Sequence, residues 1–288
     1  MKKMSANLLK AIHTISKVKD FELKEIYKGK NRVNNSGDAL EYFVKDAFSN
    51  SFSINGLSAK DKAHAGHLAY MGNSNNPPDF VLKNGDAVEV KKVGVKTSTL
   101  QLNSSYPKSK LHHDDSRITP DCRQCDGGKW KEKEIIYSVG HLDGSHIKTL
   151  WFVYGSCYAA DRKIYEKTAN KVTSSLRSAE GLDFVEDTNE LAGVRKVDPL
   201  GITFLRVRGM WLIDTPQKVF QYVLPAQYKK SVFNLYALIP ADNFAEFPKE
   251  DVTALRGNKS ITFYDVEVKS PNNPAKYMKA VLIVFSKI

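Results

Sequence analysis

Two carboxylates and one ammonium group in the middle of the chain have a spacing that could hold a divalent cation. Asp79 is followed ten positions later by Glu89, and Lys91 stands two residues beyond. Residues two apart in a strand project from the same face, so Glu89 and Lys91 would point together while Val88 and Val90 face the core. If a hairpin returns Asp79 to them, the three groups form a hard-oxygen site of the kind that Mg²⁺ prefers.

Such a site suits chemistry at a phosphodiester. A bound Mg²⁺ lowers the pKa of a coordinated water and neutralises the charge that develops on the phosphate in the transition state. Lys91 would orient or deprotonate that water and stabilise the same charge. The alternative interpretation is that Asp79, Glu89 and Lys91 are solvated residues on the outer face of a hairpin, because short acidic patterns often arise by chance.

Two strands must bring these side chains together. The alternation predicts strands over 80–82 and 87–91, joined by the turn signal Asn84-Gly85. With a strict two-residue turn, Asp79 would fall opposite Val90, on the wrong face for Glu89. A three-residue loop or a bulge would restore the register, and bulges are common next to active sites. We therefore expect one of these two irregularities in the hairpin.

A second Glu-x-Lys pattern tests how specific the first one is. Glu267 and Lys269 repeat the spacing in another predicted strand, but no Pro-Asp lies about ten residues upstream. We interpret this second copy as a polar strand face without catalytic function.

The segment after the first copy is rich in groups that bond phosphates and base edges. Amide, hydroxyl and cationic side chains gather over residues 101–113, and the alternative is an ordinary polar surface loop. The candidate DNA contacts in this segment are Gln101, Asn103, Ser105, Lys108 and Lys110.

Periodicity elsewhere predicts helices mixed with strands. Helices are expected over 5–18, about 36–47 and 161–179, and the stretch 57–76 is less regular. Further strands are expected over 135–139, 150–158, 202–213, 232–239, 261–268 and 281–285. Strands and helices without regular βα alternation favour an α/β fold in which a mixed central β-sheet is flanked by helices.

Composition and charge narrow the function classes. The 288 residues are 42% hydrophobic and 26% charged, which is typical of a globular protein with a real core. The longest apolar stretches are far shorter than the roughly 18 to 20 residues of a membrane-spanning helix. The formal net charge of +11 favours a polyanionic partner, and without a basic amphipathic helix of the membrane-surface type we prefer nucleic acid to lipid.

The three cysteines argue for a reducing compartment. An odd count in a chain of this size is unlike a disulfide framework, so we expect the cytoplasm. Cys122 and Cys125 form a CxxC that could bind zinc with help from a histidine or Cys157. A single CxxC is weak evidence for zinc, because structural sites usually need a second pair, and a reduced structural pair is the preferred interpretation.

Several longer strings resemble those of the NgoPII-type restriction endonucleases, from near the start of the chain to about Val223. The similar strings are Asn31-Arg32, 36–41 (SGDALE), 76–80 (NPPDF), 86–92 (DAVEVKK), 102–111 (LNSSYPKSKL), 197–203 (VDPLGIT) and 205–211 (LRVRGMW). The resemblance implies a PD-(D/E)XK nuclease fold and a type II endonuclease that cuts duplex DNA at GGCC with Mg²⁺.

The resemblance also implies roles for individual residues. Asp79 and Glu89 would hold the metal, and Lys91 would serve the attacking water. Glu41, on the preceding predicted helix, matches an acidic residue that often joins such metal sites. The alternative for Glu41 is a surface pair with Lys45 one helical turn away.

Arg206 and Arg208 are candidate base-reading residues. They alternate on a predicted strand, and arginine binds guanine through O6 and N7 with two hydrogen bonds, which suits a G·C target. The alternative is a pair of charges facing solvent.

Together these patterns predict a single endonuclease domain over 1–288. Its catalytic core spans about 30–160, and a C-terminal region of about 195–288 contributes strands and DNA contacts. We expect a homodimer, since a palindromic duplex is matched by two-fold protein symmetry, and a cognate DNA methyltransferase in the same system. The alternatives are a repair nuclease with little sequence preference and a non-catalytic, zinc-stabilised DNA-binding protein.

Overall fold

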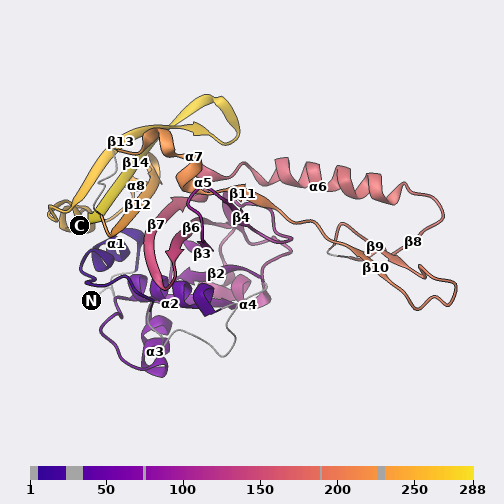
Figure 1. The fold of residues 1–288 in the computed structure, drawn as a ribbon, viewed down its shortest axis with the longest axis horizontal. Coiled ribbons are helices and arrows are strands. Elements are labelled where there is room, and N and C mark those ends of the chain that lie inside the picture. Colours follow the sequence, from indigo (N-terminus) through magenta and orange to yellow (C-terminus); the bar gives the residue numbers. More distant parts are fainter. Residues whose placement is uncertain (1–5, 24–34, 74–75, 189, 226–230) are drawn as a thin grey trace.

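A large mixed sheet lies at the centre of the computed structural model (Figure 1), which describes residues 6–23, 35–73, 76–188, 190–225 and 231–288. Its strand order is β1-β2-β3-β6-β7-β12-β14-β13, and β5 pairs with β6. β3 runs parallel to β6 and β7 parallel to β12, whereas the other neighbours are antiparallel. The predicted α/β fold with a mixed central sheet is therefore confirmed.

The strands of this sheet come from most of the chain. Their bounds are β1 (Leu68–Asn73), β2 (Asn76–Leu82), β3 (Ala87–Val93), β5 (Lys110–His112), β6 (Glu132–Asp143), β7 (His146–Tyr154), β12 (Phe233–Pro240), β13 (Ile261–Ser270) and β14 (Asn273–Lys287). Because β12 and β14 belong to the same sheet as β3 and β7, the last sixty residues share one core with the middle of the chain.

Helices cover one face of the sheet. α1 (Leu8–Ser16) packs against α2 (Asn35–Ser49) and α9 (Lys249–Arg256). α1 buries its apolar stripe, and Asn7 caps its start by accepting a hydrogen bond from the backbone N–H of Lys10 at 3.0 Å. Val88 and Val90 of β3 join this core, as their alternation predicted. The remaining helices on or near the sheet are α3 (Leu57–His67) and α8 (Ala241–Ala245).

The opposite face of the sheet carries a second core built from Tyr137, Trp151 and Tyr236. A two-stranded sheet of β4 (Thr99–Gln101) and β11 (Leu212–Asp214) lies beside it. Short helical elements complete this side: α4 (Pro120–Gln124), η2 (Cys125–Gly128), α5 (Gly155–Tyr158), α7 (Pro216–Val219) and η3 (Gln221–Val223). Glu89 and Lys91 alternate with Val88 and Val90, so they project on this second face.

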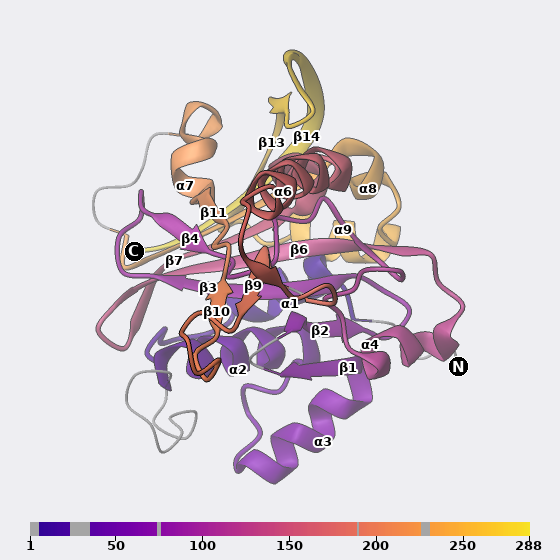
Figure 2. The ribbon, with the colours of Figure 1, turned by 90° about the vertical axis from the view of Figure 1, so that its right-hand side faces the viewer.

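An arm projects from the body (Figures 1 and 2), formed by the described residues of 161–208. It consists of α6 (Arg162–Arg177) and a three-stranded sheet of β8 (Asp183–Phe184), β9 (Ala192–Arg195) and β10 (Leu205–Val207). α6 confirms the predicted helix over 161–179, but it buries none of its residues. Figure 2 looks along this arm toward the body.

Two predicted strands need correction. The strand expected over 150–158 ends at Tyr154, and the short helix α5 begins at Gly155. Only glycine fits at this junction, because a Cβ there would lie 2.4 Å from the carbonyl oxygen of Lys108. The strand expected over 202–213 is two short strands, β10 and β11, which pair in different sheets. The irregular stretch 57–76 contains α3 and β1.

Among the described residues, no helix combines the length and the apolar character that a membrane crossing requires.

Candidate active site

The register of the β2–β3 hairpin sets Asp79 opposite Glu89. Phe80 pairs with Val88 in this antiparallel ladder, and continuing the same register by one residue brings the two carboxylates together. A close approach of β1 supports the start of β2, since a Cβ at Gly72 would lie only 2.4 Å from the carbonyl oxygen of Pro78. Glycine is therefore required where β1 passes behind the Asp79 backbone.

The hairpin loop explains this register. The backbone N–H of Leu82 donates to the carbonyl oxygen of Asp86 at 2.9 Å, so Lys83, Asn84 and Gly85 form the loop. Asn84 has a φ of 52°, a left-handed conformation that asparagine tolerates. The longer of the two loops considered from the sequence is confirmed, and it moves Asp79 to the face of Glu89.

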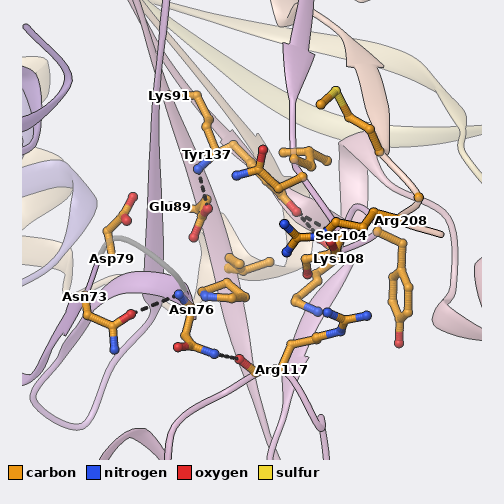
Figure 3. Close-up of a pocket in the computed structure, with 18 residues that line it drawn as sticks. Asn73, Asn76, Asp79, Glu89, Lys91, Ser104, Lys108, Arg117, Tyr137 and Arg208 are labelled. Atoms are coloured by element: carbon orange, nitrogen blue, oxygen red, sulfur yellow. Dashed lines mark hydrogen bonds and ion pairs between the residues drawn. The ribbon is translucent and has the colours of Figure 1, made fainter. Parts of the chain in front are cut away.

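The three chemical groups lie together along one side of a cavity (Figure 3). Lys91 Nζ donates to Glu89 Oε1 at 2.5 Å, and the backbone N–H of Val90 donates to Asp79 Oδ2 at 2.5 Å. Glu89 Oε2 is buried and has no hydrogen-bond partner among the described residues. A buried, unsatisfied carboxylate oxygen is costly, so this atom lacks a ligand that the described chain does not supply.

The charges of these groups are strongly coupled. Burial raises the pKa of Asp79 well above its usual value, and the negative charge of Glu89 adds to the shift, whereas Lys91 opposes it. Burial favours a lower pKa for Lys91, but the neighbouring Glu89 and Asp79 outweigh it and raise the pKa above its ordinary value. Ionising Asp79 beside Glu89 is therefore unfavourable in the absence of a further cation, and a bound cation would relieve this cost.

The donor set fits a hard divalent cation. Asp79 and Glu89 offer carboxylate oxygens, one of them unsatisfied, and Mg²⁺ usually takes one or two carboxylates and fills its other positions with water or phosphate. Among the described residues, no group of three or more His, Cys, Asp or Glu side chains is arranged to hold a metal ion. Asp79 and Glu89 are thus the two carboxylates that the hairpin brings together for such an ion.

Glu41 forms the surface pair that was weighed as its alternative role. Its Oε1 lies 2.5 Å from Nζ of Lys45, one turn further along α2. It also borders a hollow next to Lys91, and its charge helps to raise the pKa of Asp79. Its participation in metal binding stays a prediction.

The cavity beside these groups has a volume of about 650 Å³ and could admit a polymer segment. Of the candidate DNA contacts, Asn103, Ser105, Lys108 and Arg208 line it. Gln101 is exposed on β4 and borders the neighbouring hollow instead. Figure 3 shows Asp79, Glu89 and Lys91 on one side of the cavity and Arg208 on the other.

Two candidate lysines are already paired within the protein. Lys108 is buried, its ammonium forms an ion pair with Asp115, and it lies 4.7 Å from the centre of the Tyr106 ring. Lys110 does not line the cavity and pairs with Glu132 at 2.6 Å and Glu134 at 3.2 Å. Both ammonium groups are thus engaged in ion pairs within the described structure, and their contact with DNA stays a prediction.

Arg206 and Arg208 are held by a single carboxylate. Arg206 Nη2 donates to Glu190 Oε1 at 2.5 Å, and Arg208 Nε donates to Glu190 Oε2 at 3.1 Å. Both guanidinium groups are exposed, but only Arg208 lines the cavity. Arg208 makes this contact through Nε. Its two terminal amino groups make no hydrogen bond with the residues that the structure describes.

Some cavity residues were missed in the sequence. Arg117, Asn76 and Tyr106 line the cavity, and Asn76 Nδ2 donates to the carbonyl oxygen of Arg117 at 2.8 Å. Asn76 stands within the loop signal before Pro77 and could have been noticed there. Nothing in the residues around Arg117 indicated a place in the cavity. Its contact with Asn76 joins positions 41 residues apart, which a local sequence pattern does not reveal. Asn31 and Arg32 lie outside the described residues.

The other candidate features lie elsewhere. Cys122 and Cys125 are buried and hydrogen-bond to each other, and this contact lowers the pKa of Cys125. The described structure brings no further ligand into a metal cluster with them. Glu267 is exposed on β13, the edge strand far from β3, and pairs across the ladder with Lys279. The second Glu-x-Lys therefore lies on an exposed, polar strand face, and its lack of a catalytic role stays a prediction.

Comparison with known proteins gave two matches and one absence. The family model of the NgoPII restriction endonuclease matches residues 6–269. The type II restriction enzyme NgoPII of Neisseria gonorrhoeae is 42% identical over 280 residues, which cover 97% of this chain and 99% of that protein. No solved structure matches the chain.

Proposed function

The chain belongs to the NgoPII restriction endonuclease family, and from this premise we propose that it is a type II enzyme that cuts double-stranded DNA at GGCC with Mg²⁺. The general activity follows from the family. The choice of GGCC rests on the resemblance of its sequence strings, and the choice of Mg²⁺ rests on the carboxylate pair.

The observation that carries the proposal is the convergence of Asp79, Glu89 and Lys91 at one cavity. Glu89 Oε2 is buried and unsatisfied among the described residues, and Asp79 lies opposite Glu89 in the hairpin. A hard cation between the two carboxylates would bind the unsatisfied oxygen of Glu89 and neutralise negative charge on the pair. The cavity beside them leaves room for a phosphate and a water.

The protein groups position the reaction. When bound, Mg²⁺ would supply an acidified water and neutralise charge on the phosphate. Asp79 is oriented by the N–H of Val90, and Glu89 is oriented by Lys91. The Lys91 ammonium, with its raised pKa, serves as a hydrogen-bond donor and positive charge at the scissile phosphate.

We further propose that the enzyme acts as a homodimer in the bacterial cytoplasm, where its DNA substrate lies. A palindromic site presents the same contacts twice, and a two-fold dimer matches them with two active sites. A cognate DNA methyltransferase would protect the host's own sites without forming a stable complex with this chain.

The test is cleavage of a sequenced plasmid, with the fragment ends mapped. The parent protein should cut at GGCC with Mg²⁺ and not with a chelator. Asp79→Ala or Glu89→Ala should lower the cleavage rate about 10³-fold or more, because a metal ion supplies several kcal/mol of transition-state stabilisation, while specific DNA binding should persist. Glu267→Ala is the matched control and should cut like the parent.

Each alternative predicts a different result. Scattered fragment ends would indicate a nuclease with little sequence preference. Binding that needs zinc at Cys122 and Cys125, without any cutting, would indicate a zinc-stabilised DNA-binding protein. Substantial Mg²⁺-dependent cutting by Asp79→Ala would exclude the proposed metal site.

A further inference from the structure

One face of α6 carries three lysines, each one turn from the next. Lys163, Lys167 and Lys171 are exposed and border one shallow hollow on the arm. None of the three forms an ion pair with a residue that the structure describes. We call these three residues the lysine stripe. The hollow is also lined by Asn170, Ser174 and Ser175, whose side chains can donate hydrogen bonds, and by Glu166, which accepts a hydrogen bond from Tyr106.

The stripe is unfavourable for the isolated protein. Like charges at i and i+4 destabilise a helix by about 0.2 to 0.5 kcal/mol a pair. α6 buries none of its 16 residues, so core packing does not offset this repulsion. An external anion along the stripe would remove it. The first and last lysines of the stripe are eight positions apart, which corresponds to about 12 Å along the helix axis. An anion that contacts all three lysines must therefore be extended.

The stripe continues a surface that begins at the catalytic cavity. A second cavity, of about 410 Å³, shares Tyr106, Arg117 and Gly209 with the catalytic cavity. It also shares Glu166 and Asn170 of α6 with the hollow of the lysine stripe. These shared residues connect the catalytic cavity to the hollow of the lysine stripe on α6, the helix that projects from the body in Figures 1 and 2.

The base of α6 is fixed to the polar segment that lines the catalytic cavity. Tyr106 Oη donates to Glu166 Oε1 at 3.2 Å, and its ring stacks on Tyr165 with centres 5.5 Å apart. At the first turn of α6, Arg162 Nη1 donates to Asp114 Oδ1 at 2.6 Å. The helix thus leaves the body in a direction set by the residues around the cavity.

We infer that the lysine stripe binds the sugar-phosphate backbone of the DNA that flanks the cut site. Each strand of duplex DNA carries one charge per about 3.4 Å of axis, so the stripe would face about three or four phosphates of one strand. The contact would be independent of sequence, because lysines on a helix side meet phosphates rather than base edges. The inference rests on the proposed function for the place where the duplex enters.

Binding, rather than cutting, tests this inference. The variant is Lys163→Gln, Lys167→Gln and Lys171→Gln together, in an Asp79→Ala chain that leaves the DNA intact. One duplex holds GGCC within about 10 base pairs, and the other within about 40, which extends well past α6. The matched control removes the same charge on the opposite side of the sheet: Lys19→Gln, Lys249→Gln and Lys259→Gln.

The stripe variant should lose most of the preference for the long duplex, whereas the control should keep it. Each lost phosphate contact lowers the salt slope by about 0.9, so raising salt from about 50 to 200 mM should cost the stripe variant about 40-fold less affinity for the long duplex than its Asp79→Ala parent. An unchanged length preference, or an equal loss in the control, would overturn the inference.

The result stays separate from the catalytic proposal. If the unmodified protein does not cut GGCC but the stripe variant loses length-dependent binding, the proposed function fails and the stripe assignment stands. If the unmodified protein cuts GGCC and the stripe variant binds both duplexes like its parent, only the stripe assignment fails.

Discussion

At the residue scale, one carboxylate engages different nitrogen atoms of two similar arginines. Glu190 binds Arg206 through a terminal amino group and Arg208 through Nε. Reading guanine needs two donors in one plane, and Arg208 keeps its terminal pair free at the edge of the cavity. Arg206 has committed part of its planar donor edge to Glu190 and stands outside the cavity lining. We therefore predict that Arg208, rather than Arg206, reads bases.

Arg208→Ala should reduce discrimination more than Arg206→Ala. Loss of an arginine that binds guanine with two hydrogen bonds costs about 1 to 3 kcal/mol on the correct site, which is about 5- to 150-fold in affinity, and leaves unrelated duplex nearly unaffected. The measurement is the affinity ratio between GGCC and an unrelated duplex at two salt concentrations. A larger loss of that ratio for Arg206→Ala would reverse the assignment.

At the element scale, the β2–β3 hairpin holds a second carboxyl group, besides Asp79, whose pKa is raised by burial. Asp86 ends the hairpin loop, and Tyr154 Oη donates to its Oδ2 at 2.9 Å. Burial raises the pKa of Asp86 to about 6, and the Tyr154 hydrogen bond reduces the shift only partly. The element that positions the catalytic groups is therefore less stable when Asp86 is ionised.

Asp86→Asn should stabilise the protein at neutral pH. With a folded pKa raised from 3.8 to about 6, the ionised carboxylate costs stability that is fully present below pH 3.8 and is lost as the pH rises through about 6. Asparagine still accepts from Tyr154, so the variant should gain about 2 to 3 kcal/mol at pH 7 and little at pH 4.

Urea unfolding across this pH range measures the effect. Asp143→Asn, at the exposed end of β6, is the matched control and should change stability little at either pH. A gain for Asp86→Asn that is the same at pH 4 and pH 7 would mean that the charge of Asp86 is not its cause.

At the scale of the whole molecule, the described residues form a packed body and a projecting arm (Figure 1). One mixed sheet, built from strands between residues 68 and 287, fixes the catalytic hairpin between buried cores on both faces. The arm leaves this body without burying the helix that forms it. Under the proposed function, the packed body would hold the scissile phosphate and the projecting helix would follow the duplex outward.

A dimer should cut both strands in one binding event. The proposed two-fold assembly predicts a molar mass near twice that of one chain in light scattering, and supercoiled plasmid that becomes linear with little nicked intermediate. A monomer by mass, with nicked plasmid accumulating before linear product, would contradict the dimer. Mixing the parent with excess Asp79→Ala chain should raise the nicked fraction if subunits exchange.

The sequence alone determined the features that depend on local backbone geometry. Glu89 and Lys91 share a face because strand side chains alternate, and α1, α2 and α6 follow from helical periodicity. The turn signal placed the hairpin, and the register argument required either a longer loop or a bulge. These patterns are readable because each involves residues close together along the chain.

Only the tertiary structure decided which charges remain available. Lys110 is paired by Glu132 and Glu134 on another strand, and Arg206 by Glu190 on another segment. Conversely, the lysines of α6 lack such partners among the described residues because the helix leaves the body. An ion pair depends on distances across the fold, which residue types and spacing do not contain, so the sequence could name the candidate cations but not choose among them.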